Sequence, residues 1–120
     1  MKAIVCGSRS FSASEFMWTR LDALHADMGF TLVVTGGARG ADNLADFWAV
    51  GKGIPTVEMP AKWDLYGRAA GPIRNKEMLD THRPGLVVAF KDKPVSRGTD
   101  HMLNIATRAG VGTIVYTVPS

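Results

Sequence analysis

The sequence predicts a three-layer α/β fold built on a five-stranded, mainly parallel sheet with about four helices. Short runs rich in valine and isoleucine alternate with longer segments of helical character, and helical crossovers of this kind join parallel strands. The apolar runs also lack strict polar alternation, which is typical of strands that helices cover on both faces. We favour the Rossmann-like strand order 3-2-1-4-5, with the flavodoxin-like order 2-1-3-4-5 as the alternative.

The five strands are expected at residues 2–6, 31–35, 56–59, 86–90 and 113–118. The first helix is expected to begin near Ser12, where Glu15 three residues later completes a capping-box pattern, and to end at Gly29. Its apolar stripe would bury four side chains: Met17, Leu21, Leu24 and Met28.

Glycine and proline bound the other helices. The second helix is expected over residues 41–52, before Gly53, and would bury Leu44, Phe47 and Trp48. Pro72 suits the first position of a third helix, which should end before Pro84. The last helix is expected over residues 100–109, with Gly110 as its stop signal.

Length and composition indicate one globular domain over residues 1–120, because 46% of the residues are hydrophobic and 21% are charged. No apolar run approaches the roughly 18 residues of a membrane span, and no signal-peptide core is found. We therefore expect a cytoplasmic protein without membrane contact. The single Cys6 cannot form an internal disulfide and is expected to be a small core residue, and the three histidines show no metal-ligand spacing. Neither a metal nor a cofactor is expected.

The charges are unevenly distributed along the chain, whose formal net charge is +3. The loops after the first four strands and the adjoining helix starts carry a net charge of +4, and the rest of the chain carries −1. The residues behind the +4 are Arg9, Arg39, Lys62, Arg68, Arg74, Lys91, Lys93 and Arg97 against Asp42, Asp64, Asp92 and Asp100. This imbalance would attract an anionic ligand to the carboxyl edge of the sheet.

The strongest local signal is the loop after the second strand, where a β-branched run breaks into glycines just before a helix. Gly36, Gly37 and Gly40 would let backbone N–H groups approach an anion, and Arg39 would add positive charge. The alternative is an ordinary strand-to-helix turn with a surface arginine.

Three other loops carry similar chemistry, and in a parallel sheet all four would meet at one edge, where ligands bind in open α/β folds. Arg74 and Asn75 are expected beside them on the third helix. The candidate ligand-binding residues of the three loops are Gly7, Ser8 and Arg9; Lys62, Trp63, Tyr66 and Arg68; and Arg97, Gly98 and Thr99.

Residues 60–71 are expected to form a long loop without secondary structure, as in many lids and binding loops. Trp63 and Tyr66 could stack on a base there, although Trp63 could instead fill the core under the loop. Phe16 and Trp18 lie beside the apolar stripe of the first helix, and an exposed pair of this kind often marks a subunit contact.

The chain resembles the SLOG superfamily, in particular its YspA-related branch, which is often met in bacterial and phage genomes. The resemblance covers nearly the whole chain and is carried by four sequence blocks, at residues 7–11, 35–42, 60–63 and 67–75. It implies a Rossmann-like fold and ligands that are nucleotides or nucleotide-derived molecules. Because SLOG relatives commonly self-associate, it also implies a homodimer.

SLOG relatives include the Lonely Guy phosphoribohydrolases, which cleave the N-glycosidic bond of nucleoside monophosphates, and the DNA-processing protein A family, which binds single-stranded DNA. The hydrolases carry a functional arginine in the pattern R-x-x-x-M, which Arg74 matches here. Their G-G-x-G-T-x-x-E motif falls on residues 95–102, where the first two glycines are absent and Met102 replaces the acidic residue. Asp100 or Asp42 could supply the missing carboxylate, or each could merely stabilise the first turn of a helix.

Three functions follow from these residues. The first is the binding of a nucleotide or nucleotide-derived anion, such as an ADP-ribose-like molecule or a signalling nucleotide. The second is hydrolysis of the N-glycosidic bond of nucleotides, with Arg74, Asp100 and Asp42 as candidate catalytic residues. The third is binding of single-stranded nucleic acid, which would use the same basic edge and aromatic residues. It is the least favoured of the three, because strand-binding proteins usually show a longer track of basic and aromatic residues. Whether the protein is an enzyme stays open at this point.

Overall fold

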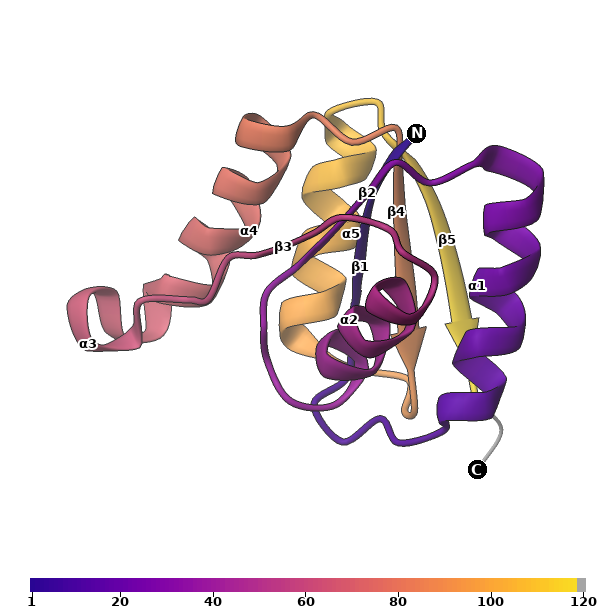
Figure 1. The fold of residues 1–120 in the computed structure, drawn as a ribbon. Helices are drawn as coiled ribbons and strands as arrows, with labels where there is room; N and C mark the ends of the chain where they lie inside the picture. The colour runs from indigo at the N-terminus through magenta and orange to yellow at the C-terminus, as the bar shows by residue number, and fades with distance from the viewer. Residues whose placement is uncertain (119–120) are drawn as a thin grey trace.

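The computed structural model describes residues 1–118 of the chain and contains a central sheet of five strands, all parallel (Figure 1). The strands are β1 (Lys2–Gly7), β2 (Leu32–Thr35), β3 (Thr56–Glu58), β4 (Leu86–Lys91) and β5 (Gly112–Thr117). Their order in the sheet is β3-β2-β1-β4-β5, which confirms the Rossmann-like prediction and excludes the flavodoxin-like alternative. The order reverses between β1 and β4, the position at which open α/β sheets bind ligands.

Helices cover both faces of this sheet. The first face packs against α1 (Ser14–Met28) and α2 (Ala41–Gly51), and the second against α4 (Ala70–His82) and α5 (Arg97–Arg108). Neighbouring residues of β1 serve opposite faces, since Val5 belongs to the first cluster and Ile4 to the second. Within residues 1–118, no helix has the length and apolar character needed to cross a membrane.

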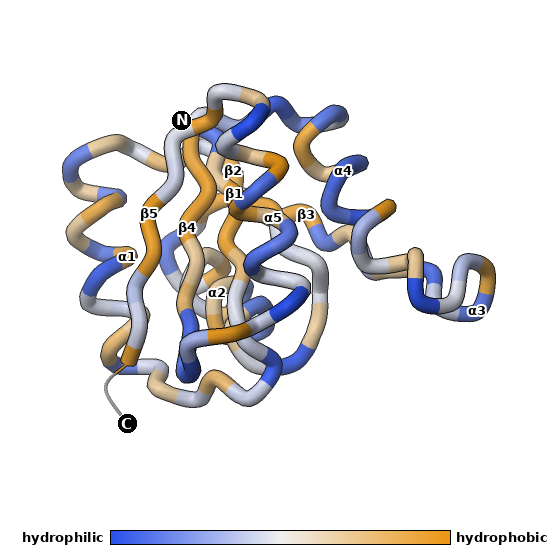
Figure 2. The backbone as a smooth tube through the Cα atoms, turned by 180° about the vertical axis from the view of Figure 1, so that it is seen from behind, coloured by the Kyte–Doolittle hydropathy of each residue, from blue (hydrophilic) through white to orange (hydrophobic). Residues whose placement is uncertain are grey.

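The segment predicted as a twelve-residue loop, 60–71, is instead largely helical. It contains the short helix α3 (Trp63–Tyr66), the 3-10 turn η1 (Gly67–Ala69) and the first two residues of α4. Both views show α3 projecting sideways from the body of the protein (Figures 1 and 2). We call residues 60–69 the arm. The loop prediction failed because the polar and glycine-rich composition of the segment concealed single helical turns too short to show a periodic apolar stripe.

Three helix starts differ from the predicted ones. The chain enters α1 at Ser14, with Ala13 at the N-cap and no side-chain cap, so the capping box at Ser12 is wrong. The buried ring of Phe11, packed on Phe90 at 5.8 Å between ring centroids, anchors the chain just before this helix. The helices α4 and α5 each begin two or three residues early, at Ala70 and Arg97. Pro72 then lies inside the first turn of α4, where no intrahelical N–H is required.

The buried face of α2 is made of small residues, Ala41, Ala45 and Ala49, all fully inaccessible. This stripe brings the helix close to the sheet and turns Phe47 outward, so the prediction that Phe47 is buried is wrong: its side chain is 70% exposed. The prediction for Trp48 is confirmed, because one residue further round the helix its ring lies in the core.

The aromatic residues of α1 also differ from expectation. Phe16 and Trp18 are half-buried and pack within the chain, where Trp18 Nε1 donates to the carbonyl oxygen of Leu44 at 3.1 Å. The exposed Phe47 ring stacks on Trp18 with centroids 5.6 Å apart. Phe16 and Trp18 are therefore not an exposed pair. At the end of α1, Met28 is exposed rather than buried.

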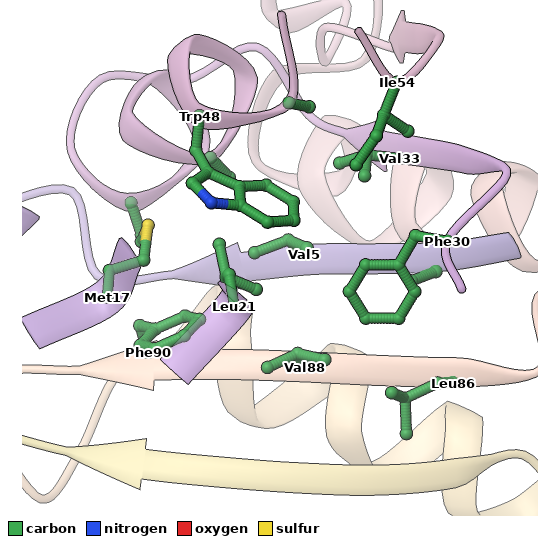
Figure 3. Close-up of a cluster of buried hydrophobic side chains, with 14 of the residues drawn as sticks. Val5, Met17, Leu21, Phe30, Val33, Trp48, Ile54, Leu86, Val88 and Phe90 are labelled. Carbon is green, nitrogen blue, oxygen red and sulfur yellow. The ribbon is translucent and has the colours of Figure 1, made fainter. Parts of the chain in front are cut away.

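The core between α1, α2 and the sheet is closely packed (Figure 3). Leu21 lies among Phe90, Met17 and Val5 in this cluster. Its side chain is completely inaccessible, so truncation would leave a cavity with no route for solvent.

We predict that Leu21→Ala lowers the free energy of unfolding by about 2–5 kcal/mol, because it removes buried methyl groups and leaves a void. Leu65→Ala on the exposed arm is the matched control and should change stability by less than about 0.5 kcal/mol. Urea denaturation of both variants measures the difference, and equal effects would contradict the packing described for α1.

Candidate functional site

The carboxyl ends of β1, β2 and β4 open into a cavity of about 1040 Å³. Its walls come from the loops after these strands, from the inner side of α4, from the first turns of α5 and from Trp63 on the arm. Small-molecule sites generally measure about 300–1,000 Å³, so the cavity can hold a ligand of nucleotide size. It lies at the edge and the topological switch point where the sequence predicted a site.

Eleven of the sixteen predicted ligand-binding residues line this cavity. They are Gly7, Arg9, Gly36, Arg39, Trp63, Arg68, Arg74, Asn75, Arg97, Gly98 and Thr99. The other five, Ser8, Gly37, Gly40, Lys62 and Tyr66, lie outside it. Parallel strand order thus brings together residues that are up to 92 positions apart in the chain. Their binding of a ligand stays a prediction.

The cavity is strongly electropositive. Six basic side chains line it, and among the described residues Asp42 is its only acidic one; the basic residues are Arg9, Arg39, Arg68, Arg74, Lys93 and Arg97. Cationic groups that line one concave surface reinforce each other's potential and attract anions.

Arg74 is the most firmly held of these cations. Its Nη1 donates to the carbonyl oxygens of Gly36 at 3.1 Å and Met59 at 3.3 Å, and its Nε donates to Asn75 Oδ1 at 3.0 Å. Among residues 1–118 its Nη2 has no hydrogen-bond partner. Burial lowers the pKa of Arg74, and the nearby carboxylate of Asp42 opposes this shift. The side chain is thus fixed in place with one amino group left for a ligand.

Gly36 is required for this arrangement. A Cβ atom there would overlap the guanidinium group of Arg74 and also press on a carboxylate oxygen of Asp42. Gly40 is required for a different reason: its φ of 81° lies in the left-handed region, and its Cα faces the carbonyl oxygens of Ser8 and Arg9. These two glycines thus allow close packing between loops.

Two backbone N–H groups of the glycine loop, residues 36–40, are already hydrogen-bonded within the protein. The N–H of Gly37 donates to Thr35 Oγ1 at 3.2 Å, and the N–H of Ala38 donates to Asp42 Oδ2 at 3.2 Å. Thr35 Oγ1 in turn donates to the carboxylate of Asp46 at 2.9 Å. The N–H of Gly37 is therefore not available as an anion donor, because an internal acceptor occupies it, whereas the roles of the Gly36 and Gly40 N–H groups stay a prediction. Side chains supply the formal positive charges of the cavity.

Asp42 and Asp100, both predicted as candidate catalytic carboxylates, have different surroundings. Asp42 lines the cavity at 6% exposure, and burial raises its pKa to about 6, opposed by the Ala38 N–H and by Arg74. Asp100 lies outside the cavity and forms an ion pair with Lys91 at 2.8 Å, which lowers the pKa of Asp100. This geometry favours the interpretation of Asp100 as a residue that stabilises the first turn of its helix, because its side chain pairs with Lys91 and does not line the cavity.

The remaining predicted residues are explained by their positions. Ser8 is buried, and its Oγ accepts the N–H of Asp92 at 3.4 Å, so it holds two loops together. Lys62 and Tyr66 lie exposed on the arm. Trp63, in contrast, sits at the cavity wall with 47% of its surface exposed, and the Arg9 guanidinium lies 5.2 Å from its ring centroid. The alternative that Trp63 fills the core is therefore wrong.

Sequence reasoning did not predict that Met78, His101 and Met102 line the cavity. Cys6, which was expected to be a core residue, also borders the cavity. The available signal was helical spacing, since His101 and Met102 lie one turn after Gly98 on α5, and Met78 lies one turn after Arg74 on α4. Burial raises the pKa of the Cys6 thiol, which keeps it protonated and unreactive. Among residues 1–118 no cluster of acidic, histidine or cysteine side chains has the composition of a metal site.

Known proteins are similar to this chain over regions that include several of the lining residues. The family model described as the YspA, cpYpsA-related SLOG family matches residues 1–66, which include the first two loops of the cavity and Trp63. The chain is also similar to the Gene 61 protein of Mycobacterium phage D29, with 38% identity over 123 aligned positions that cover 96% of this chain and 95% of that protein.

We predict that Gly36→Ala destabilises the protein by about 1–3 kcal/mol, because its methyl group displaces the guanidinium of Arg74 from the Gly36 carbonyl. Gly98→Ala is the matched control. Gly98 lies in the first turn of α5, and no atom lies within 4 Å of the position that a Cβ would take, so this variant should keep the native stability or gain slightly. Thermal and urea unfolding measure both. Similar stabilities for the two variants would mean that Arg74 does not depend on the glycine.

Proposed function

This chain belongs to the YspA, cpYpsA-related SLOG family, and we propose that its cavity binds a nucleotide-derived anionic small molecule such as ADP-ribose or a signalling nucleotide. The observation that carries the proposal is the composition of the cavity, in which six basic side chains face one carboxylate. Nucleotide phosphates are the ligands that such a site would attract most strongly.

The start of α5 supports an anion in the same cavity. Among residues 1–118 the backbone N–H groups of Arg97, Gly98 and Thr99 have no acceptor, whereas the next N–H, that of Asp100, is bonded to the carbonyl oxygen of Ser96. Free N–H groups in the first turn of a twelve-residue helix carry partial positive charge toward the cavity that these residues line.

Trp63 supports a nucleotide rather than a simple inorganic anion. Its half-exposed ring borders a cavity large enough for a sugar and a base as well as phosphate. Indole rings bind nucleobases by stacking, which contributes about 1–3 kcal/mol per base. Phosphate binding by arginines and base stacking on Trp63 would together select nucleotides.

Isothermal titration calorimetry with ADP-ribose, nucleoside monophosphates and cyclic dinucleotides tests the proposal. Native protein should bind at least one of them saturably, and Arg39→Ala should raise its Kd about tenfold or more, because a charge-assisted hydrogen bond contributes about 1.5–3 kcal/mol. The control Arg108→Ala removes an equal charge from the last turn of α5, outside the cavity, and should leave the Kd nearly unchanged. Absence of saturable binding, or equal affinity for native protein and Arg39→Ala, would refute the proposal.

We predict that ADP-ribose binding strengthens as the pH falls through about 6, because Asp42, the one acidic lining residue within 1–118, then becomes neutral. The two phosphates of ADP-ribose each carry a single, strongly acidic ionisation, so the charge of the ligand stays constant over this range. Asp42→Asn keeps an acceptor for the Ala38 N–H while removing the titration. A pH dependence that persists unchanged in Asp42→Asn would contradict this assignment.

The position of Asp42 also favours a second function, hydrolysis of a nucleotide N-glycosidic bond. In such a reaction the bond between ribose and base breaks, water adds to the sugar, and a carboxylate stabilises the cationic sugar or activates the water. Met102 occupies the position of the acidic residue in the resembled hydrolases and lines the same cavity, so Asp42 is the carboxylate that remains available.

Incubation with nucleoside monophosphates should then release free base and ribose 5-phosphate, detectable by chromatography. Asp42→Asn should lower the rate at least about a hundredfold, in line with loss of a general acid or base. Asp64→Asn, on the exposed arm, is the matched control and should retain the native rate. Failure of native protein to release base from any of the monophosphates, at high enzyme concentration, would remove this second function and leave the binding proposal intact.

A further inference from the structure

The orientation of the Asn75 side chain is set by its neighbour. Asn75 lies on α4 at 5% exposure, and its Oδ1 accepts the Nε–H of Arg74 at 3.0 Å. A guanidinium group only donates hydrogen bonds, so the atom of the amide that faces it must be the oxygen. The Asn75 amide cannot be turned over without placing two donors against each other.

The nitrogen of the same amide therefore faces α5. Nδ2 donates to the carbonyl oxygen of Gly98 at 3.1 Å and lies 3.2 Å from Nδ1 of His101. An amide nitrogen only donates, so Nδ1 of His101 must be the acceptor of this pair, and the ring proton must be on Nε2.

We propose that His101 is a ligand-contacting residue of the cavity and that Asn75 is its positioning residue, holding the ring as the Nε2–H tautomer so that it presents a neutral donor to the bound nucleotide. His101 lines the cavity together with Gly98, one turn earlier on α5. Its Nδ1 is occupied by Asn75, and among residues 1–118 Nε2 has no partner. The ligand contact rests on the proposed function, whereas the role of Asn75 does not.

This donor complements the arginines. Guanidinium groups attract any anion, whereas a neutral N–H in a fixed direction requires an acceptor atom at one place, such as a phosphoryl oxygen or a ring nitrogen of the base. The chain of contacts from Gly36 through Arg74 and Asn75 to His101 also links the loop after β2, α4 and α5. Because its donor is neutral and has a fixed direction, His101 would contribute to the specificity of binding more than to the overall attraction of anions.

Nitrogen-15 NMR of the histidine rings, above the pH range in which histidine titrates, tests the tautomer. The protein contains its own reference, because His25 Nδ1 accepts the backbone N–H of Phe30 at 2.9 Å and is thereby fixed as Nε2–H. His101 should show the same pattern of nitrogen shifts as His25. The Nδ1–H pattern, or an average of the two tautomers, would overturn the role given to Asn75.

The Asn75→Asp variant sharpens this test. A carboxylate accepts a hydrogen bond where the amide donated one, so the proton of His101 should move to Nδ1 while the signals of His25 stay unchanged. Should the aspartate variant fail to fold, Asn75→Ala serves instead: without a donor at this place, His101 should show averaged tautomers. Retention of the pure Nε2–H pattern in the folded variant would overturn the proposal.

The ligand contact is tested by titrating ADP-ribose into His101→Phe and His101→Gln. Phenylalanine keeps the bulk but not the donor and should raise the Kd about tenfold, whereas glutamine keeps an N–H donor and should raise it only about two- to threefold. His82→Gln, at the end of α4 and outside the cavity, should bind as native protein does. Equal affinity for native protein and His101→Phe would overturn the contact.

The failure of this inference can be told apart from failure of the proposed function. If native protein binds none of the nucleotides, the proposed function and the His101 contact both fail, yet the NMR pattern still decides the role of Asn75. If native protein binds ADP-ribose and loses affinity in Arg39→Ala but not in His101→Phe, the proposed function stands and the His101 contact is wrong.

Discussion

The position of Arg74 is the constraint on which the cavity depends. Burying a guanidinium group is costly unless acceptors replace its water, and here the carbonyl oxygens of Gly36 and Met59 and the amide oxygen of Asn75 do so. These acceptors belong to three different segments, so a single side chain joins the ends of β2 and β3 to α4. The walls of the cavity are consequently held by the same contacts that place its central cation.

The formal positive charge of the cavity lies on side chains. The side chains of Asp42 and Thr35 accept hydrogen bonds from the N–H groups of Ala38 and Gly37, respectively, and so stabilise a tight turn at the end of β2. The turn lets α2 begin beside β1, where its alanines pack against the sheet. These contacts fix the geometry of the loop around which the arginines gather, and the first turn of α5 adds backbone N–H groups at the cavity.

The burial of the Asp42 carboxyl group at the cavity has two consequences. Because its carboxylate is removed from water, its charge is costly, and the neighbouring cation only partly compensates. A group that gains a proton near pH 6 can tune the affinity of the cavity for anions, and it can also exchange a proton with a bound molecule. Asp100 lacks both properties because Lys91 neutralises it outside the cavity.

The α/β class with a parallel sheet and the sign of the site's charge were predictable from the sequence because both follow from local rules, whereas the strand order was favoured over one alternative that the structure then excluded. Apolar runs that lack polar alternation indicate strands covered on two faces, and parallel strands place their carboxyl ends, with Arg9, Arg39 and Arg97, at one edge. The helical turn at Trp63 was missed because a single turn shows no periodic apolar stripe. The exposed ring of Phe47 was predicted wrongly, since burial depends on how closely distant segments approach. No pattern within α2 reveals that three alanines, rather than Phe47, form its contact with the sheet.

The amino-acid sequence is thus sufficient to predict the α/β class and the electropositive character of one edge, because hydrophobic period and residue charge are properties of short segments. Which polar groups are free depends on the folded structure. Hydrogen-bond partners such as Asp42 for the glycine loop, or Asn75 for His101, come from segments that meet only after folding, and a donor or acceptor satisfied inside the protein is no longer offered to a ligand.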